Sequence, residues 1–410
     1  MVLNYYMTFL KIRILLLNTM EKDFKKLAEQ YKNELFNNII PFWMNNSVDN
    51  LYGGYMTCLD REGKVFDTDK FVWLQGREVW MFSSLYNKVE KRPEWLEMAL
   101  HGARFLLDHG RDPDGNWYFS LNREGQPLVE AYNIFSDCFA TMAFGQLSIA
   151  TGSEEYARIA KTTFENIIKR SSNPKGKYNK AVAPTRPLKG FSLPMILCNL
   201  SLEIEHLLPE KMVNETIEKC INEVMEVFYD HHSGLIFENV NPDGSFCDSF
   251  EGRLLNPGHA IEAMWFVMDL SVRLKRPELA EKAVKIILNT LQHGWDREFG
   301  GIFYFLDSKG YPLQQLEWDQ KLWWVHIETL ISLIKGYALT GNQECFEWFE
   351  KVHDYTWSRF PDPGKGEWFG YLNRRGEVLL SLKGGKWKGC FHLPRGLFQV
   401  WRTLESLHKV

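Results

Sequence analysis

The sequence offers little material for a disulfide framework or a zinc site. Its seven cysteines include no CxxC pair and no group at metal-ligand spacing. An odd number of widely spaced cysteines is typical of a protein that stays in a reducing compartment. We therefore expect a cytoplasmic protein without a disulfide framework.

An excess of positive charge is also missing. The chain has 48 Lys and Arg against 52 Asp and Glu, a formal net charge of −4. A dedicated nucleic-acid binder needs basic side chains to neutralise phosphates, so this class is disfavoured. Apolar residues make up 45% and charged residues 24%, which is ordinary globular composition and argues against disorder.

No hydrophobic run is long enough to predict a membrane span. Residues 1–19 are apolar, but Lys11 and Arg13 interrupt them, and the segment is shorter than the roughly 20 residues that a spanning helix needs. The charge-first order and small-residue cleavage site of a secretory signal are missing too. We interpret residues 1–19 as an N-terminal extension, with a divergent signal or anchor as the alternative. Residues 20–410 are then a single folded domain.

Several catalytic motifs are lacking. There is no HExxH zinc motif and no GxSxG nucleophile elbow. The segment LKGGKWKG at 382–389 does not match GxxxxGKS or GxxxxGKT, so we interpret it as an exposed hairpin return. Four residues could in principle form a metal site: His259, Glu262, His326 and Glu328. They do not have the tight spacing that is typical of metal ligands, so we expect no metal.

Aromatic residues, in contrast, are abundant. They make up 14% of the chain and include 15 Trp. Most are expected in the core, but such a surplus also suits a large cleft that stacks on sugar rings.

A short pattern recurs along the chain: Gly, two to four aromatic or apolar residues, and a polar turn with a second Gly. Its copies begin at Gly53, Gly115, Gly234, Gly300 and Gly366, which are 62, 119, 66 and 66 residues apart. The double step predicts a degenerate sixth copy near residue 175. Each copy reads as a short hairpin, because alternating apolar residues flank turns such as DREG and NPDG.

Two helical segments follow each hairpin, with apolar residues at three- and four-residue spacing. Examples are 73–89 with 94–110, and 258–274 with 278–294. Repeats that cannot bury their own apolar faces must stack on their neighbours. Six helix pairs predict an all-α ring, six inner helices inside six outer ones, with the hairpins at one rim. An open helical solenoid is the alternative.

Polar residues that look out of place fall at the starts of the aromatic-rich inner helices. A charge in such surroundings costs free energy unless it is paired or functional. Each could be a structural histidine or ion pair, but a closed ring would point all four clusters at one cavity: Arg77 with Glu78, His259 with Glu262, His326 with Glu328, and His392 with Arg395. His259 and Glu262 share a helix face, whereas the two-residue spacing of His326 and Glu328 lets only one of them face the cavity.

These motifs resemble the N-acylglucosamine 2-epimerase family, also called the renin-binding protein family. They read WLQGREVWMF, NPGHAIEAMWF, KLWWVHIE and WKGCFHLPRGLF, and the resemblance extends over nearly the whole chain from about Met20. It implies an (α/α)6 barrel, which agrees with the repeat count. It also implies catalytic roles for His259 and His392, and cleft positions for a further set: Arg77, Glu262, Glu328, Arg395 and, as a weaker match, Lys180. We add His326 as a supporting residue.

The reaction that the resemblance implies is epimerisation at C2 between N-acetyl-D-glucosamine and N-acetyl-D-mannosamine. Ring opening makes C1 an aldehyde and the C2 proton acidic; one base removes it and an acid returns a proton to the other face, which suits two histidines. Arg77 is expected to stabilise the enolate oxygen. Glu262 is expected to hold His259, while Glu328 and Arg395 bind hydroxyls or assist ring opening.

Three alternatives remain. One is an isomerase or epimerase of the same fold acting on a free hexose such as mannose. Such relatives, and the cellobiose 2-epimerases, carry an extra histidine on the third inner helix, which SLPMILCNLS at 192–201 lacks. The second is an (α/α)6 glycoside hydrolase, which needs a pair of carboxylates. The third is a non-catalytic carbohydrate- or protein-binding relative.

The resemblance also bears on cofactors and partners. It implies no required cofactor, although some members respond to ATP as an allosteric activator. The expected partner is a small amino sugar, with no nucleic acid and no membrane. Family analogy alone predicts a homodimer.

Overall fold

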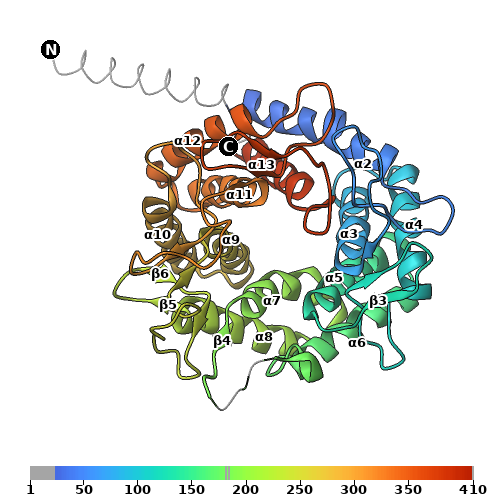
Figure 1. Ribbon diagram of the computed structural model, residues 1–410, viewed down its shortest axis with the longest axis horizontal. Helices are drawn as coiled ribbons and strands as arrows, with labels where there is room; N and C mark the ends of the chain where they lie inside the picture. The colour runs from blue at the N-terminus through green and yellow to red at the C-terminus, as the bar shows by residue number, and fades with distance from the viewer. Residues whose placement is uncertain (1–23, 181, 183–184, 409–410) are drawn as a thin grey trace.

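Two concentric circles of helices make up the protein (Figure 1). The computed structural model describes residues 24–180, 182 and 185–408, so the predicted extension at 1–19 lies outside the described residues. The inner circle contains α3 (Val72–Lys88), α5 (Ile134–Thr151), α7 (Ser192–Glu203), α9 (Pro257–Leu274), α11 (Trp323–Thr340) and α13 (His392–His408). The outer circle contains α4 (Pro93–His109), α6 (Glu154–Arg170), α8 (Glu210–Asn222), α10 (Pro277–Gly294) and α12 (Gln343–Arg359).

The N-terminal helical segment supplies the sixth outer helix. It runs through residues 24–34, the π-helical turn η1 (Leu35–Ile39) and α2 (Ile40–Asn46). Phe36 of this segment packs edge-to-face on Trp401 of α13, with ring centroids 5.7 Å apart. The N-terminal helical segment and α13 therefore meet and close the ring. The predicted (α/α)6 barrel is confirmed and the open solenoid is wrong.

The two circles differ in how their sequences are patterned. In α11 every residue from Trp323 to Ile334 is buried, because an inner helix meets neighbours on all sides. The outer α10 buries only one stripe, including Leu279, Ala283 and Ile287, and turns its charged residues to solvent. Sequence periodicity therefore separates inner from outer helices.

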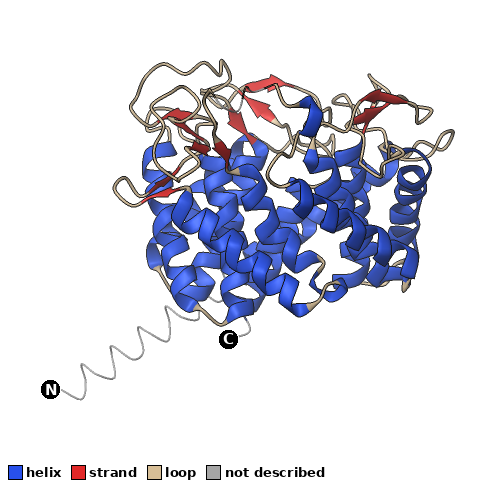
Figure 2. Cartoon of the chain, turned by 90° about the horizontal axis from the view of Figure 1, so that it is seen from below, coloured by secondary structure: helices blue, strands red, loops and turns tan. Residues whose placement is uncertain are grey.

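The connections carry short strands, and these lie at one end of the barrel (Figure 2). Two antiparallel three-stranded sheets are formed by β1 (Lys70–Phe71), β2 (Ser120–Leu121) and β3 (Pro127–Val129), and by β10 (Lys321–Leu322), β11 (Tyr371–Leu372) and β12 (Val378–Leu380). Antiparallel pairs are formed by β4 (Lys189–Gly190) with β7 (Asn239–Val240), β5 (Tyr229–Asp230) with β6 (Leu235–Ile236), and β8 (Leu254–Leu255) with β9 (Leu306–Asp307).

The five recurring glycines sit in equivalent turns. Each has a positive φ, between 70° and 84°, a conformation that L-residues with a Cβ rarely adopt. An antiparallel bridge closes each turn, for example Trp295 with Ile302 around Gly300. The predicted degenerate copy near residue 175 is not such a hairpin. That segment contains the 3-10 turn η2 (Gly176–Tyr178), and β4 after it pairs with the distant β7.

Three repeats also share one ion-pair arrangement at this rim. In each, an Asp at the start of the glycine turn binds a buried Lys that precedes an inner helix and an Arg from a neighbouring hairpin. The sets are Asp49 with Lys70 and Arg123, Asp296 with Lys321 and Arg374, and Asp362 with Lys383 and Arg61. These contacts tie one hairpin to the next, and so hold the rim in place around the central opening.

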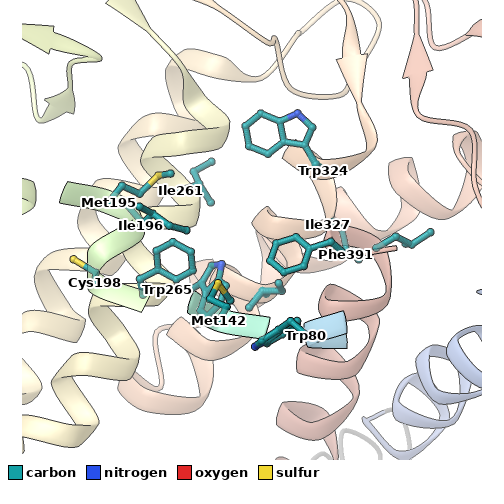
Figure 3. Close-up of a cluster of buried hydrophobic side chains, with 14 of the residues drawn as sticks. Trp80, Met142, Met195, Ile196, Cys198, Ile261, Trp265, Trp324, Ile327 and Phe391 are labelled. Atoms are coloured by element: carbon teal, nitrogen blue, oxygen red, sulfur yellow. The ribbon is translucent and has the colours of Figure 1, made fainter. Parts of the chain in front are cut away.

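Inner helices bring apolar side chains together at the centre of the ring (Figure 3). Met142 comes from α5, Ile196 from α7, Trp265 from α9 and Ile327 from α11. This cluster forms the buried core between the inner helices. No helix in the described part of the chain is both long and apolar enough to cross a bilayer. All seven cysteines are free thiols, and only Cys247 is not buried.

Candidate active site

A cavity of about 470 Å³ opens among the inner helices on the hairpin side. Aromatic side chains dominate its wall: Trp73, Phe135, Phe139, Tyr304, Trp323, Trp324, Tyr371, Trp387 and Phe391. Its charged and polar lining comes from Arg77, Ser192, His259, Glu262, Glu317, Gln320 and His392. A mostly aromatic wall with a few convergent polar groups is suited to a sugar.

His259 occupies the first turn of α9, where the side chain of Asn256 caps the helix by accepting from the His259 backbone N–H at 3.1 Å. Its imidazole lines the cavity and is half-buried. The Nδ1–H group donates to both carboxylate oxygens of Glu238, each at 3.1 Å. Burial acts to lower the pKa of His259, but the charge and hydrogen bond of Glu238 outweigh it and raise the pKa.

His392 is the first residue of α13 and lines the same cavity. Its Nδ1–H group donates to Oε1 of Glu328 at 2.7 Å. Burial lowers its pKa well below the ordinary value, and the nearby charge of Arg77 acts in the same direction. Both histidines therefore have Nδ1 on a carboxylate, which leaves Nε2 as the ring nitrogen for chemistry.

Arg395 lies beneath His392, one turn further along α13. Its guanidinium is buried and pairs with both Glu262 and Glu328. Glu328 also accepts from the indole N–H of Trp265 at 2.8 Å, so its charge is shared among several partners. Glu262, Glu328 and His392 place possible ligand atoms within 4.8 Å of one another, but the Arg395 cation binds the same two carboxylates, so these residues do not fit a metal ion.

Arg77 is in a different situation. It has no ion pair and no hydrogen bond within the described residues, and its Nε is buried without a partner. Three rings surround its guanidinium, with centroids at 4.3 Å (Trp73), 4.0 Å (Phe139) and 4.6 Å (Phe391). Burial lowers its pKa to about 9. A guanidinium held by ring faces at a cavity wall keeps its donors available for a ligand oxygen.

Trp324 connects the two histidines. Its ring centroid lies 5.4 Å from that of His259 and 5.6 Å from that of His392. Gly258 allows this close packing, because a Cβ at that position would come within 2.6 Å of the indole. The two imidazoles thus both contact one indole.

Four predicted residues do not line the cavity: Lys180, His326, Glu328 and Arg395. Lys180 is exposed and does not line it. His326 is fully buried: Nδ1–H donates to the carbonyl of Leu322 at 2.7 Å, and Nε2 accepts from the N–H of Ile302 at 3.1 Å. The expectation that His326 supports the substrate is therefore wrong, because both ring nitrogens hold the backbone.

Two partner assignments also change. Glu262 was expected to hold His259, but it pairs with Arg395, and Glu238 takes the place at His259. Glu328 and Arg395 were expected to bind hydroxyls or assist ring opening, but both are fully buried, and Glu328 instead links the imidazole of His392 to the guanidinium of Arg395. The sequence offered no signal for Glu238, which belongs to a hairpin turn region and is brought to His259 only by the rim packing.

Comparisons with known proteins agree with this architecture. The family model for N-acylglucosamine 2-epimerase matches residues 54–393. The chain is 39% identical over 394 residues to the N-acylglucosamine 2-epimerase of Mus musculus, covering 93% of this chain and 92% of that protein. It is 38% identical to that of Homo sapiens, covering 95% and 93%. The solved cellobiose 2-epimerase of Bacillus thermoamylovorans superposes with a TM-score of 0.80 at 20% identity, covering 94% of this chain and 100% of that chain.

The family model and the mammalian relatives identify this (α/α)6 barrel as a carbohydrate epimerase, an isomerase. Within that class, this chain belongs to the N-acylglucosamine 2-epimerase family.

Proposed function

We propose that this enzyme interconverts N-acetyl-D-glucosamine and N-acetyl-D-mannosamine. The observation that carries the proposal is the pair His259 and His392, which line one cavity with Nδ1 of each ring bonded to a carboxylate. Inversion at C2 requires a base and an acid on the two faces of that carbon, and this pair supplies both. The mammalian relatives, which carry the name of this activity, support the same substrate class.

The reaction begins with the open-chain sugar, in which C1 is an aldehyde. One histidine takes the C2 proton through Nε2, and the electron pair of that bond moves into C1–C2, leaving negative charge on O1. Arg77, which has donors to spare, stabilises this oxygen. The other histidine then returns a proton to the opposite face of C2, and the aldehyde reforms with inverted configuration.

The apolar part of the cavity suits the acyl group. Met195 and Ile196 of α7 face the cavity together with Phe135 and Phe139. The missing third-repeat histidine falls in this stretch, so α7 lines the cavity mainly with apolar side chains, Ser192 being its polar contribution. An acetamido methyl group is stabilised by burial against such a wall. A free hydroxyl at C2 would be desolvated there without a hydrogen-bond partner, which costs free energy.

Proton NMR of N-acetylmannosamine with the enzyme in D₂O tests the proposal. Growth of N-acetylglucosamine signals, with deuterium replacing hydrogen at C2 of the product, is expected. Parallel samples with ATP test a nucleotide effect. If neither sample converts the amino sugar while mannose is isomerised, the substrate class is wrong.

We further propose that the enzyme acts as a cytoplasmic homodimer. The free cysteines support a reducing compartment, and the family resemblance supports the dimer. Light scattering coupled to size-exclusion chromatography checks the mass, with about twice 48.1 kDa expected.

A further inference from the structure

Glu238 lies outside every motif that identified the site, yet it makes the most direct contact with His259. Each of its carboxylate oxygens is 3.1 Å from Nδ1 of the imidazole. Its side chain is only 12% exposed, and His259 is its one side-chain partner among the described residues. The full negative charge of Glu238 is therefore directed at a single group.

The backbone of Glu238 is held by two other parts of the rim. Its N–H donates to the carbonyl of Leu254 at 3.2 Å, and its carbonyl accepts from the N–H of Phe191 at 3.0 Å. These bonds link it to β8, ahead of α9, and to the residue before α7. The carboxylate is thus preorganised, and it does not depend on a flexible loop.

The carboxylate at His392 has a different electrostatic environment. Glu328 divides its charge between His392, the guanidinium of Arg395 and the indole of Trp265. Arg395 also lies 3.4 Å from Nδ1 of His392. One histidine therefore meets an undivided negative charge, while the other meets a carboxylate already neutralised by a cation.

We propose that Glu238 is a positioning residue that keeps His259 protonated in the free enzyme with Nε2 toward the sugar, so that one epimer meets His259 as the acid and His392 as the base; the two roles are exchanged when the other epimer reacts. This assignment rests on the proposed function. The charged and titratable groups that face His259 are Glu238 from the β6–β7 connection, Glu262 from α9 and His392 from α13. The two acidic groups raise the pKa of His259, whereas burial and Arg77 lower that of His392.

Each proton is accounted for in this arrangement. Nε2 of neutral His392 takes the C2 proton, and the C–H electron pair becomes the enolate. The enolate carbon then takes the proton from Nε2 of His259, and the C–H bond reforms on the other face. The enzyme finishes with His392 protonated and His259 neutral, and exchange with water restores the starting state.

The pH profile of kcat/KM tests the assignment. Activity is lost at low pH as His392 gains a proton and at high pH as His259 loses one. Glu238→Gln keeps an oxygen that can accept from Nδ1–H but removes the charge, so only the high-pH limb moves down, by about one to three pH units. Glu238→Asp keeps the charge and returns the limb toward its wild-type position.

Glu251→Gln is the matched control. Glu251 is exposed in the same rim region and pairs with exposed Arg186. The pH profile of the Glu251→Gln enzyme is therefore expected to match that of the wild type. If Glu238→Gln lowers the rate equally at every pH and leaves both limbs of the profile in place, the residue has only a structural role and the proposal is overturned. Full activity with an unchanged profile overturns it as well.

A second measurement is independent of the substrate. Ring ¹⁵N chemical shifts of histidines in the free enzyme, assigned with His259→Asn and His392→Asn, report each protonation state directly. His259 is expected to be protonated and His392 neutral at pH 7, and Glu238→Gln deprotonates His259. If the wild type fails to convert amino sugars but these shifts appear, the proposed function falls and the role of Glu238 stands; two neutral histidines at pH 7 would refute that role.

Discussion

His259 and His392 come from helices at different points of the ring, yet both contact the same indole, that of Trp324, at centroid distances of 5.4 and 5.6 Å. This shared contact makes them a pair rather than two separate polar residues. The carboxylates contact Nδ1 of each ring, which leaves Nε2 for a substrate in the cavity. A two-histidine reaction needs this arrangement, because the proton donor and acceptor must reach one carbon.

Replacing either histidine is expected to abolish most of the activity without unfolding the enzyme. His259→Asn or His392→Asn should each lower kcat by about 10²- to 10⁴-fold, because each removes one proton-transfer group. Deuterium exchange at C2 in D₂O separates the roles, since an enzyme that keeps its base still exchanges the proton of one epimer. If both variants retain wild-type turnover, the two-histidine mechanism is refuted.

Replacing Arg77 is expected to affect catalysis far more than stability. Arg77→Met should lower kcat by about 10²- to 10³-fold, because the enolate oxygen loses its preorganised donors. The free energy of unfolding should change by less than about 1 kcal/mol, since the lost ring contacts are offset by relief of a buried, unpaired cation. Steady-state kinetics and urea denaturation measure the two effects. A large loss of stability with kcat intact would show Arg77 to be structural.

His326 should show the opposite behaviour. His326→Ala removes the acceptor for the Ile302 N–H and the donor to Leu322, and should cost about 2 to 4 kcal/mol of stability. Its kcat should remain within a few-fold of the wild type at temperatures where the variant is folded. Thermal denaturation and kinetics on the same sample test this expectation. A specific fall in kcat at unchanged stability would restore His326 to the active site.

Glu78 provides a test of buried charge away from the chemistry. It is fully buried on α3, accepts from Ser47 at 2.6 Å, and burial raises its pKa to about 8. Its pKa in the unfolded chain is lower, so the unfolded state releases the proton first, and this residue reduces stability as pH rises from about 4.5 to 8. Glu78→Gln should therefore stabilise the enzyme by about 2 kcal/mol or more at pH 8.

Urea denaturation of the Glu78→Gln variant at pH 8 and at pH 4.5 measures that difference. The gain should nearly vanish at the lower pH, where the wild-type carboxyl is protonated in the folded state and only half ionised in the unfolded state. An equal change at both pH values would mean that the substitution acts through packing.

Much of the architecture could be predicted because it depends on patterns of residues that are close together in the sequence. The helix pair expected at 258–274 and 278–294 differs from the observed α9 and α10 by one residue at each start. Turn glycines with positive φ mark five hairpins. The degenerate copy near residue 175 was predicted wrongly because that segment pairs with a strand far along the chain, and spacing carries no information on such pairing.

The candidate site was predicted in part. His259, His392 and Arg77 stand at the cavity wall, where their aromatic surroundings and family motifs suggested. Their partners were not predictable from spacing. Glu262 lies one turn from His259 on the same helix, but it forms an ion pair with Arg395 from another helix. A hydrogen bond between two charged groups is stronger than one to a neutral imidazole, so the spacing on α9 alone did not predict the partner.

By itself, the sequence determined the repeat, the alternation of inner and outer helices, and the residue types able to move a proton at C2. All of these depend on the order of residues within a few helical turns. Only the tertiary structure decided which carboxylate serves which histidine, because rim packing brings Glu238 to His259 and the packing of α11 on α13 brings Glu328 to His392. It also decided that His326 holds the backbone, since both of its ring nitrogens are occupied once the helices pack.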